Sequence, residues 1–190
     1  MEQGTIEWFE TRSGKMTASN AQAIGNNGKG LETYVESLMA EKYSKNRESF
    51  SNEHTERGTE LEPIARYLYE LKTGNTVEQV GFIDKGTFGC SPDGLIGEDG
   101  GIEIKCLDDK NHFHVVMTEK IDSKHEWQIQ MSLLVTGRKW WDYVCFNPNF
   151  ERDMVIMRVF PDEEKHKKLK DGIEKGTKLI NEIEKRYERE

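Results

Sequence analysis

Residues 91–105 read SPDGLIGEDGGIEIK, and the rest of the chain is interpreted around them. Two isoleucines, Ile102 and Ile104, alternate with Glu103 and Lys105. Successive side chains of a β-strand point to opposite faces. We therefore predict a strand on which Glu103 and Lys105 share one face while the isoleucines face a core.

The first half of this stretch predicts a hairpin that ends beside a carboxylate. Gly100 and Gly101 come just before the strand, so residues 94–101 are expected to form the turn. Such a hairpin brings Asp93 next to Glu103. Two carboxylates held together repel each other, and a divalent cation relieves the repulsion. Hard oxygen ligands suit Mg²⁺ or Mn²⁺, which makes the hairpin a candidate metal site.

An ordinary exposed hairpin with a Glu/Lys surface is the competing interpretation, because glutamate and lysine alternating with isoleucine is a common pattern. Pro92 favours a site, since its ring fixes a backbone angle next to Asp93. If the site exists, Lys105 lies on the same face as Glu103 and could orient or help deprotonate an attacking water.

Composition limits the class of protein. The 190 residues are expected to form a single domain, 1–190, with 35% hydrophobic and 33% charged residues. No apolar run is long enough to cross a membrane and the first residues are acidic, so we expect a cytoplasmic protein. A net charge of −8 argues against nucleic acid as a partner, unless a local group of cations contacts it.

The three cysteines are odd in number and widely spaced. They predict reduced, buried thiols instead of a disulfide framework or a zinc site. Three cysteines also cannot supply the four ligands of an iron–sulfur cluster.

Apolar periodicity predicts four helices and two regions of strands. The helical stripes are Leu31, Tyr34, Val35, Leu38 and Met39 in 31–45; Leu61, Ile64, Ala65, Leu68 and Leu71 before Gly74; Trp127, Met131, Leu134 and Val135 in 125–136; and Leu169, Ile173, Ile180 and Ile183 in 162–190. One or two strands are expected in 76–90 and two more at 140–147 and 154–160, with polar irregular chain at 46–57 and 107–124. This order predicts an α/β domain around a mixed sheet.

Two polar residues on these helices have two interpretations each. Glu62 completes a capping box with Thr59, or it is a third carboxylate directed at the metal site. Pro63 fits best in a first helical turn and leaves both possibilities open. Gln128 lies beside an apolar stripe, as a buried amide bonded to backbone or as a polar group in a site.

The stretch around residues 5–24 is ambiguous as well. Trp8 and Phe9 are expected to anchor it, and a turn from Arg12 to Lys15 carries two cations. Thr17 or Ser19 is then expected to cap a short helix, a place where free backbone N–H groups can bind a phosphate. An ordinary loop and cap explain the same residues.

Residues 107–124 carry the remaining ionisable candidates. His112 and His114 lack carboxylate partners at ligand spacing, so both are expected to be solvated. Lys110, Lys120 and Lys124 are candidates for an edge that faces DNA.

Taken together, these motifs resemble the PD-(D/E)XK nuclease superfamily and, more narrowly, the phage lambda-type exonucleases of viral recombination. The resemblance covers about residues 8–147, in the order of that family. Its motifs are WFETRSGKMTAS, GTELEPIARYLYE, SPDGL, EIKC and QIQMSLLVTG. It implies a restriction-endonuclease-like α/β fold with a central mixed sheet flanked by helices.

The resemblance also implies roles for individual residues. Asp93, Glu103 and the backbone carbonyl of Ile104 would bind Mg²⁺, and Glu62 would serve a second ion or its waters. Lys105 would position the attacking water, supported by Gln128. The positions of Arg12 and Ser19 match those that hold the 5′-phosphate of the digested strand.

The activity implied is 5′→3′ digestion of linear double-stranded DNA to mononucleotides, using two Mg²⁺ ions that Mn²⁺ can replace. It would leave 3′ overhangs for recombination by single-strand annealing. The family further implies a homotrimer and an annealing protein as partner. No apolar wedge that would split base pairs is found in front of the acidic helix.

Two alternatives have different consequences. One is an endonuclease or a Cas4-like nuclease, which the three scattered cysteines disfavour in its iron–sulfur form. The other is a non-catalytic protein that binds DNA ends, which the complete set of Asp93, Glu103 and Lys105 disfavours.

Overall fold

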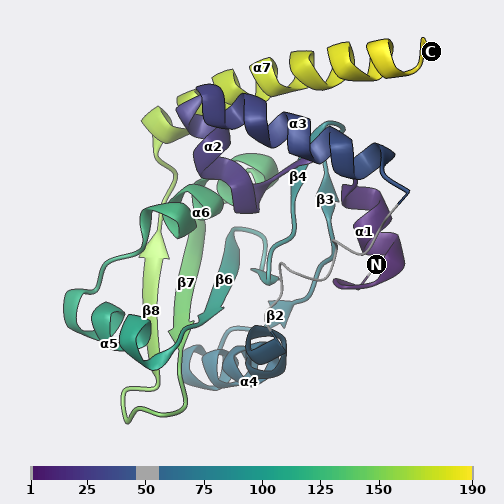
Figure 1. The fold of residues 1–190 in the computed structure, drawn as a ribbon. Coiled ribbons are helices and arrows are strands. Elements are labelled where there is room, and N and C mark those ends of the chain that lie inside the picture. Colours follow the sequence, from purple (N-terminus) through teal and green to yellow (C-terminus); the bar gives the residue numbers. More distant parts are fainter. Residues whose placement is uncertain (1, 46–55, 190) are drawn as a thin grey trace.

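The structure is a computed structural model that describes residues 2–45 and 56–189. Most of the loop expected at 46–57 lies outside the described residues. Two sheets and the helices around them make up the fold (Figure 1). No helix within the described ranges has the length and apolar character needed to span a membrane.

The larger sheet contains strands formed by the 91–105 stretch. Its strand order is β2-β5-β6-β7-β8, and only the β6–β7 pair is parallel. The bounds are β2 Val77–Glu78, β5 Gly94–Ile96, β6 Gly100–Cys106, β7 Trp140–Phe146 and β8 Met154–Val159. The predicted mixed α/β fold is confirmed. The expected turn is shorter than predicted, because residues 94–96 and 100–101 already pair as strands.

Alternation along β6 decides which residues face which helix. Ile102 and Ile104 pack with Ala65 and Tyr69 of α4 (Glu56–Thr73) in one apolar cluster. Glu103 lies on the opposite face of the sheet, which is covered by α5 (Asp109–Thr118) and α6 (Ser123–Thr136). The predicted strand with isoleucines facing the core is therefore confirmed.

A second, small sheet and four helices form the other end of the molecule. The sheet is β1 (Met16–Thr17), β4 (Phe88–Cys90) and β3 (Ile83–Asp84), in that order. The segment 76–90 thus forms three short strands distributed over both sheets. The helical elements are α1 (Ile6–Arg12), the 3-10 turn η1 (Ala18–Asn20), α2 (Ala21–Asn26), α3 (Lys29–Tyr43) and α7 (Glu163–Tyr187).

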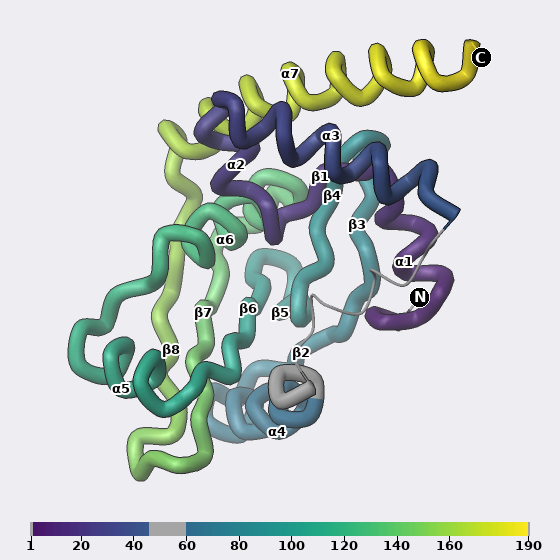
Figure 2. The backbone as a smooth tube through the Cα atoms, viewed as in Figure 1, coloured from purple at the N-terminus to yellow at the C-terminus, as the bar shows by residue number. Residues whose placement is uncertain are grey.

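Helix α7 packs across α2 and α3, and its C-terminal part extends beyond α2 (Figure 2). Leu169, Ile173 and Ile180 are buried there with Met16 and Leu31, in a third apolar cluster that also includes one side of α6. The stripes predicted for α3 and α7 are confirmed.

The stripe predicted for α4 is partly wrong. Ile64 and Leu71 are 49% and 63% exposed, while Tyr69 is fully buried. The helix begins at Glu56, so Thr59 lies inside it and cannot be its N-cap, and Pro63 lies beyond the first turn. The capping-box interpretation of Glu62 is therefore wrong.

Residues 107–124 contain a helix that periodicity did not indicate. Asp108 caps α5 by accepting a hydrogen bond from the backbone N–H of Asn111. His112, expected to be solvated, is fully buried, and its Nε2 lies 2.9 Å from the carbonyl oxygen of Arg152. His114 is exposed as predicted. Burial of His112 follows from its position against the β7–β8 turn, which local sequence does not show.

Cys90 and Cys145 are buried, Cys106 is half-buried, and all three are free thiols. The predicted burial is confirmed for Cys90 and Cys145 but not for Cys106, and the reduced state of the thiols stays a prediction.

Candidate active site

A single cavity of about 500 Å³ collects the side chains predicted for the site. Residues from four separate regions of the sequence line it: the N-terminal segment, α4, the 91–106 stretch and the start of α6. The predicted residues in its lining are Arg12, Ser19, Glu62, Asp93, Glu103, Ile104, Lys105 and Gln128. The fold thus brings together the eight residues to which the resemblance assigns a role in metal binding, catalysis or 5′-phosphate binding.

Glu103 lies at the centre of this arrangement and is only 1% exposed. Its Oε1 accepts hydrogen bonds from Nε2 of Gln128 at 2.6 Å and from Nζ of Lys105 at 2.7 Å. Its Oε2 is buried and has no hydrogen-bond partner in the part of the chain that the structure describes. A buried carboxylate oxygen without a partner is costly, so this atom is available to a cation.

Asp93 is held at the point where β5 begins. Its Oδ2 accepts a hydrogen bond of 2.6 Å from the backbone N–H of Ile104. The next residue, Gly94, allows close packing of β2, since a Cβ there would lie 2.1 Å from a methyl group of Val77. The side chain of Asp93 and the backbone of Ile104 therefore meet at one edge of the cavity.

Glu62 reaches the cavity from α4 and forms an ion pair with Arg66 one turn later. Burial, with the nearby charge of Asp93, raises the pKa of Glu62 to about 7. Burial also raises the pKa of Glu103 to about 8, although the ammonium of Lys105 opposes the change. The ionised forms of Glu62 and Glu103 are therefore destabilised, because the nearby cations do not fully offset burial and the repulsion between carboxylates.

These properties fit a hard divalent cation. The donors are carboxylate and carbonyl oxygens, one of them is buried without a partner, and added positive charge would favour the ionised forms. Within residues 2–45 and 56–189, no group of three or more His, Cys, Asp and Glu side chains is placed so that it could hold a metal ion by itself. An open site with few protein ligands is what Mg²⁺ ordinarily uses.

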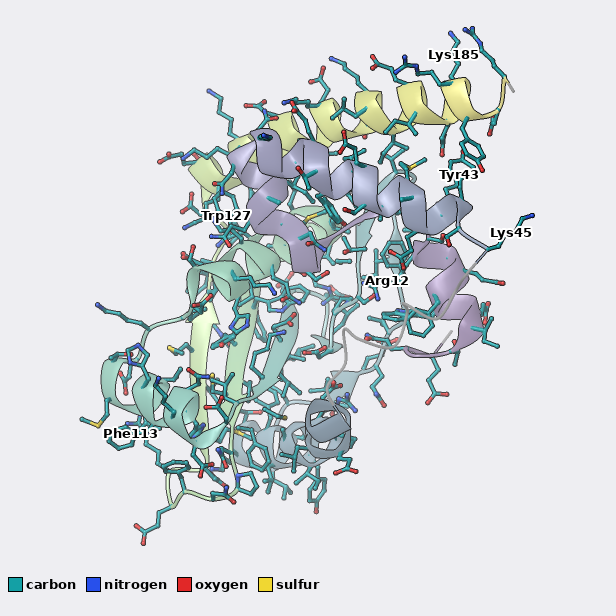
Figure 3. The ribbon with its side chains drawn as sticks, viewed as in Figure 1. Arg12, Tyr43, Lys45, Phe113, Trp127 and Lys185 are labelled. Atoms are coloured by element: carbon teal, nitrogen blue, oxygen red, sulfur yellow. The ribbon has the colours of Figure 1, made fainter. Side chains whose placement is uncertain are left out.

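The opposite wall of the cavity is formed by Arg12 and the η1 turn. Arg12 ends α1 and lies on the side of that helix facing the strands (Figure 3). The hydroxyl of Ser19 is hydrogen-bonded to the hydroxyl of Thr17 at 2.9 Å. Thr17 occupies the predicted N-cap position, at the start of η1, but its side chain makes no capping hydrogen bond, and Ser19 lies inside the turn. Both residues line the cavity.

The structure decides between the two interpretations of Gln128. Its amide points into the cavity and bonds Glu103, whereas Gln130 is the buried amide of this helix. Gln130 donates to the carbonyl oxygen of Phe160 and accepts from the N–H of Asp162, both at 2.9 Å.

Several lining residues were missed as site residues. His125 precedes Gln128 by three positions, so helical spacing places it on the same face and could have indicated it. Its Nδ1 lies 2.8 Å from the hydroxyl of Tyr143. Among the lysines considered for a DNA-facing edge, Lys124 lines the cavity, whereas Lys110 and Lys120 are exposed and do not.

Residues 7–139 match the sequence profile of the YqaJ-like viral recombinase domain. The chain belongs to this family. The family assignment predicted from the motifs is confirmed, and the match contains every predicted site residue. Comparison with curated protein sequences finds no match.

Solved structures agree with membership in the YqaJ-like viral recombinase family. The chain is 31% identical to an alkaline exonuclease, LHK-Exo, from Laribacter hongkongensis, with a TM-score of 0.83, covering 97% of this chain and 99% of that one. The same exonuclease in complex with dAMP gives a TM-score of 0.82 at the same identity and coverage. A phage-related exonuclease from Haemophilus somnus 129PT shares the fold at 14% identity, with a TM-score of 0.66 over 91% and 96% of the two chains. The fold is thus the PD-(D/E)XK type.

Proposed function

We propose that this protein is a Mg²⁺-dependent 5′→3′ exonuclease that digests linear double-stranded DNA from 5′-phosphorylated ends. The observation that carries the proposal is the buried carboxylate of Glu103, bonded by Lys105 and Gln128 on one oxygen and unpartnered on the other. Similarity to an alkaline exonuclease over almost the whole chain supports the same class of reaction.

Asp93, Glu103 and the carbonyl of Ile104 would hold the first cation, and Glu62 would hold a second or its waters. Mn²⁺ is expected to replace Mg²⁺, because both prefer hard oxygen ligands. Divalent cations held there supply Lewis-acid stabilisation of the charge on the phosphoryl oxygens.

Lys105 and Gln128 position the groups that react at the metal site. Burial acts to lower the pKa of Lys105, but the charges of Glu103 and Asp93 outweigh it and raise the pKa, so the side chain remains an ammonium. An ammonium in this position orients the attacking water and the phosphate by charge and hydrogen bonding. Gln128 fixes the rotamer of Glu103, as partners of metal-binding carboxylates commonly do.

Arg12 and Ser19, on the other wall, support the proposed polarity. A guanidinium and a hydroxyl there suit the terminal 5′-phosphate. In hydrolysis, water oxygen bonds to phosphorus and the bond to the 3′-oxygen breaks, with a proton passing to that oxygen. The products are a 5′-mononucleotide and a strand with a new 5′-phosphate, which the same wall can bind. The dAMP complex of LHK-Exo supports a mononucleotide product.

The remaining parts of the proposal concern partners. The 3′ overhangs would serve phage-type recombination by single-strand annealing, with an annealing protein as partner. A homotrimer is proposed on the resemblance to the lambda-type enzymes.

The test uses linear duplexes labelled at either end, with and without a 5′-phosphate, in Mg²⁺ and in EDTA. We expect release of 5′-mononucleotides from 5′-phosphorylated ends in Mg²⁺ only. Lys105→Ala should bind DNA but lose digestion by a factor of about 10²–10⁴. Lys139→Ala, which removes an exposed lysine paired with Asp99, is the matched control and should digest normally. Undiminished digestion by the Lys105 variant would refute the assignment.

A further inference from the structure

Trp8 joins the two walls of the cavity. The indole is 1% exposed and lines the cavity, yet it belongs to none of the three apolar clusters formed by the described residues. A buried tryptophan would ordinarily be a core residue. Trp8 also contacts two residues that line the cavity, Arg12 and Ser91.

On one side, the face of the indole supports Arg12. The guanidinium carbon lies 3.9 Å from the centroid of the Trp8 ring, one helical turn away along α1. This is the stacked geometry of a cation–π contact, which holds a guanidinium plane in one orientation. Arg12 can then present its N–H groups to the cavity from a fixed position.

On the other side, the edge of the indole is bonded to the segment that leads into Asp93. Nε1 of Trp8 donates a hydrogen bond of 3.0 Å to the hydroxyl of Ser91. Gln3 reinforces the link, since its amide donates to the carbonyl oxygen of Pro92 at 2.7 Å and to that of Val80 at 3.0 Å. The start of the chain is thereby fixed to the strand entry that carries the carboxylate.

We infer that Trp8 is a positioning residue that sets the guanidinium of Arg12 relative to Asp93, and hence the distance between the end-phosphate pocket and the metal site. The inference rests on the proposed function. In a stepwise exonuclease this distance selects which phosphodiester is cut, because the terminal phosphate is held at one end and hydrolysis occurs at the other. A misplacement of the bound end is expected to reduce the benefit of a 5′-phosphate.

The quantity to measure is the ratio of kcat/KM on 5′-phosphorylated ends to that on 5′-hydroxyl ends. A merely structural role of Trp8 would lower stability and activity on both ends and leave the ratio unchanged. Arg158 over the ring of Trp140, at 3.7 Å, is a second pair of the same chemistry, and neither residue lines the cavity. Trp140→Leu is therefore the matched control.

We expect Arg12→Ala to lose the preference and Trp8→Leu to reduce it by about tenfold, the order of a desolvated cation–π contact. Trp8→Phe keeps an aromatic face and should retain most of the preference. Arg12→Lys keeps the charge but cannot stack as a plane, so it should lose nearly as much as Arg12→Ala. Trp140→Leu should leave the ratio as in the wild type.

The outcomes separate the inference from the function on which it rests. If Arg12→Ala loses the preference for 5′-phosphorylated ends but Trp8→Leu or Arg12→Lys keeps the wild-type ratio, only the positioning role of Trp8 is overturned. A wild-type ratio in Arg12→Ala would overturn both the pocket and the inference. The positioning role can be tested with Arg12→Lys even if Trp8→Leu does not fold, because the Arg12→Lys variant keeps the buried indole of Trp8.

Discussion

The side-chain amide of Gln128 donates a hydrogen bond of 2.6 Å to the carboxylate of Glu103, across the gap between α6 and β6. This contact exists because α6 packs on the face of the sheet that Glu103 shares, with Ile129 and Leu133 buried against β7. It directs one oxygen of Glu103 and leaves the other without a partner in the described residues.

Gln128→Ala should therefore lower Mg²⁺-dependent digestion by about 10- to 100-fold, the usual effect of losing a partner of a metal-binding group. The free energy of unfolding should change little. Gln130→Ala is the matched variant on the same helix, and removes bonds to the backbone of Phe160 and Asp162. It should lower the unfolding free energy by about 1–3 kcal/mol and leave the activity of the folded protein intact. Equal effects of the two variants on activity would contradict the assignment.

Metal should stabilise the fold more at high pH than at low pH. The folded-state pKa values of Glu62 and Glu103, about 7 and about 8, lie above their ordinary value of 4.5. The folded protein thus binds more protons than the unfolded chain between about pH 4.5 and 8. The stabilisation from these groups is complete below pH 4.5 and is lost as the pH rises through 7 and 8.

Mg²⁺ binds the ionised carboxylates, so the free energy of unfolding that it adds should grow from pH 6 to pH 8, to about 2.7 kcal/mol at a hundredfold excess over Kd, and the melting temperature should rise with it. EDTA should abolish the effect. Glu103→Gln should remove both the metal effect and part of the pH slope, whereas Glu98→Gln, at an exposed position of the β5–β6 turn, should change neither. A metal effect that is independent of pH would speak against the carboxylate site.

His125 should make the metal-free protein less stable in acid. Burial, followed by the charge of Lys105, lowers the pKa of His125 from 6.5 to about 4. Between these values the unfolded chain binds a proton that the folded protein does not, so stability is present above pH 6.5 and is lost as the pH falls towards 4.

His125→Gln retains a polar partner for Tyr143 and removes the titration. In urea unfolding at pH 6.5, 5 and 4, this variant should lose about 2 kcal/mol less than the wild type over that range, allowing for the partial exposure of the ring. His114→Gln, at an exposed position of α5, should behave as the wild type. Identical pH profiles for all three proteins would disprove the role of His125.

DNA binding should depend steeply on salt despite the net charge of −8. Cations line the cavity, among them Lys124 at the start of α6. The slope of log K against log[salt], measured in the inactive Lys105→Ala background, should be about −0.9 for each phosphate contact. Lys124→Gln should make the slope shallower by about 0.9. Lys185→Gln, at the far end of α7 (Figure 3), should leave the slope unchanged. A slope near zero in all of these proteins would mean that the net charge of −8 does argue against DNA as the partner.

Local pattern was sufficient for the elements that carry the chemistry. Alternation predicted that Glu103 and Lys105 share a face of β6, and helical spacing predicted the buried sides of α3 and α7. Both are properties of neighbouring residues, because the periods of strand and helix are fixed by the backbone.

The contacts between elements required the tertiary structure. Periodicity assigned Ile64 and Leu71 to the core of α4, but the sheet meets that helix on the side of Ala65 and Tyr69. It also missed α5 and the burial of His112, because the helix is largely polar and its partner, the β7–β8 turn, is distant in sequence.

The same division holds for the site. The sequence by itself determined the residue types, the strand that carries two of them, and the family that their order indicates. Only the tertiary structure decided that Gln128 and not Gln130 bonds Glu103, and that Trp8 joins Arg12 to the segment before Asp93. The physical reason is that a side chain's face follows from local backbone geometry, whereas its partner depends on how separate elements pack to bury their apolar surfaces.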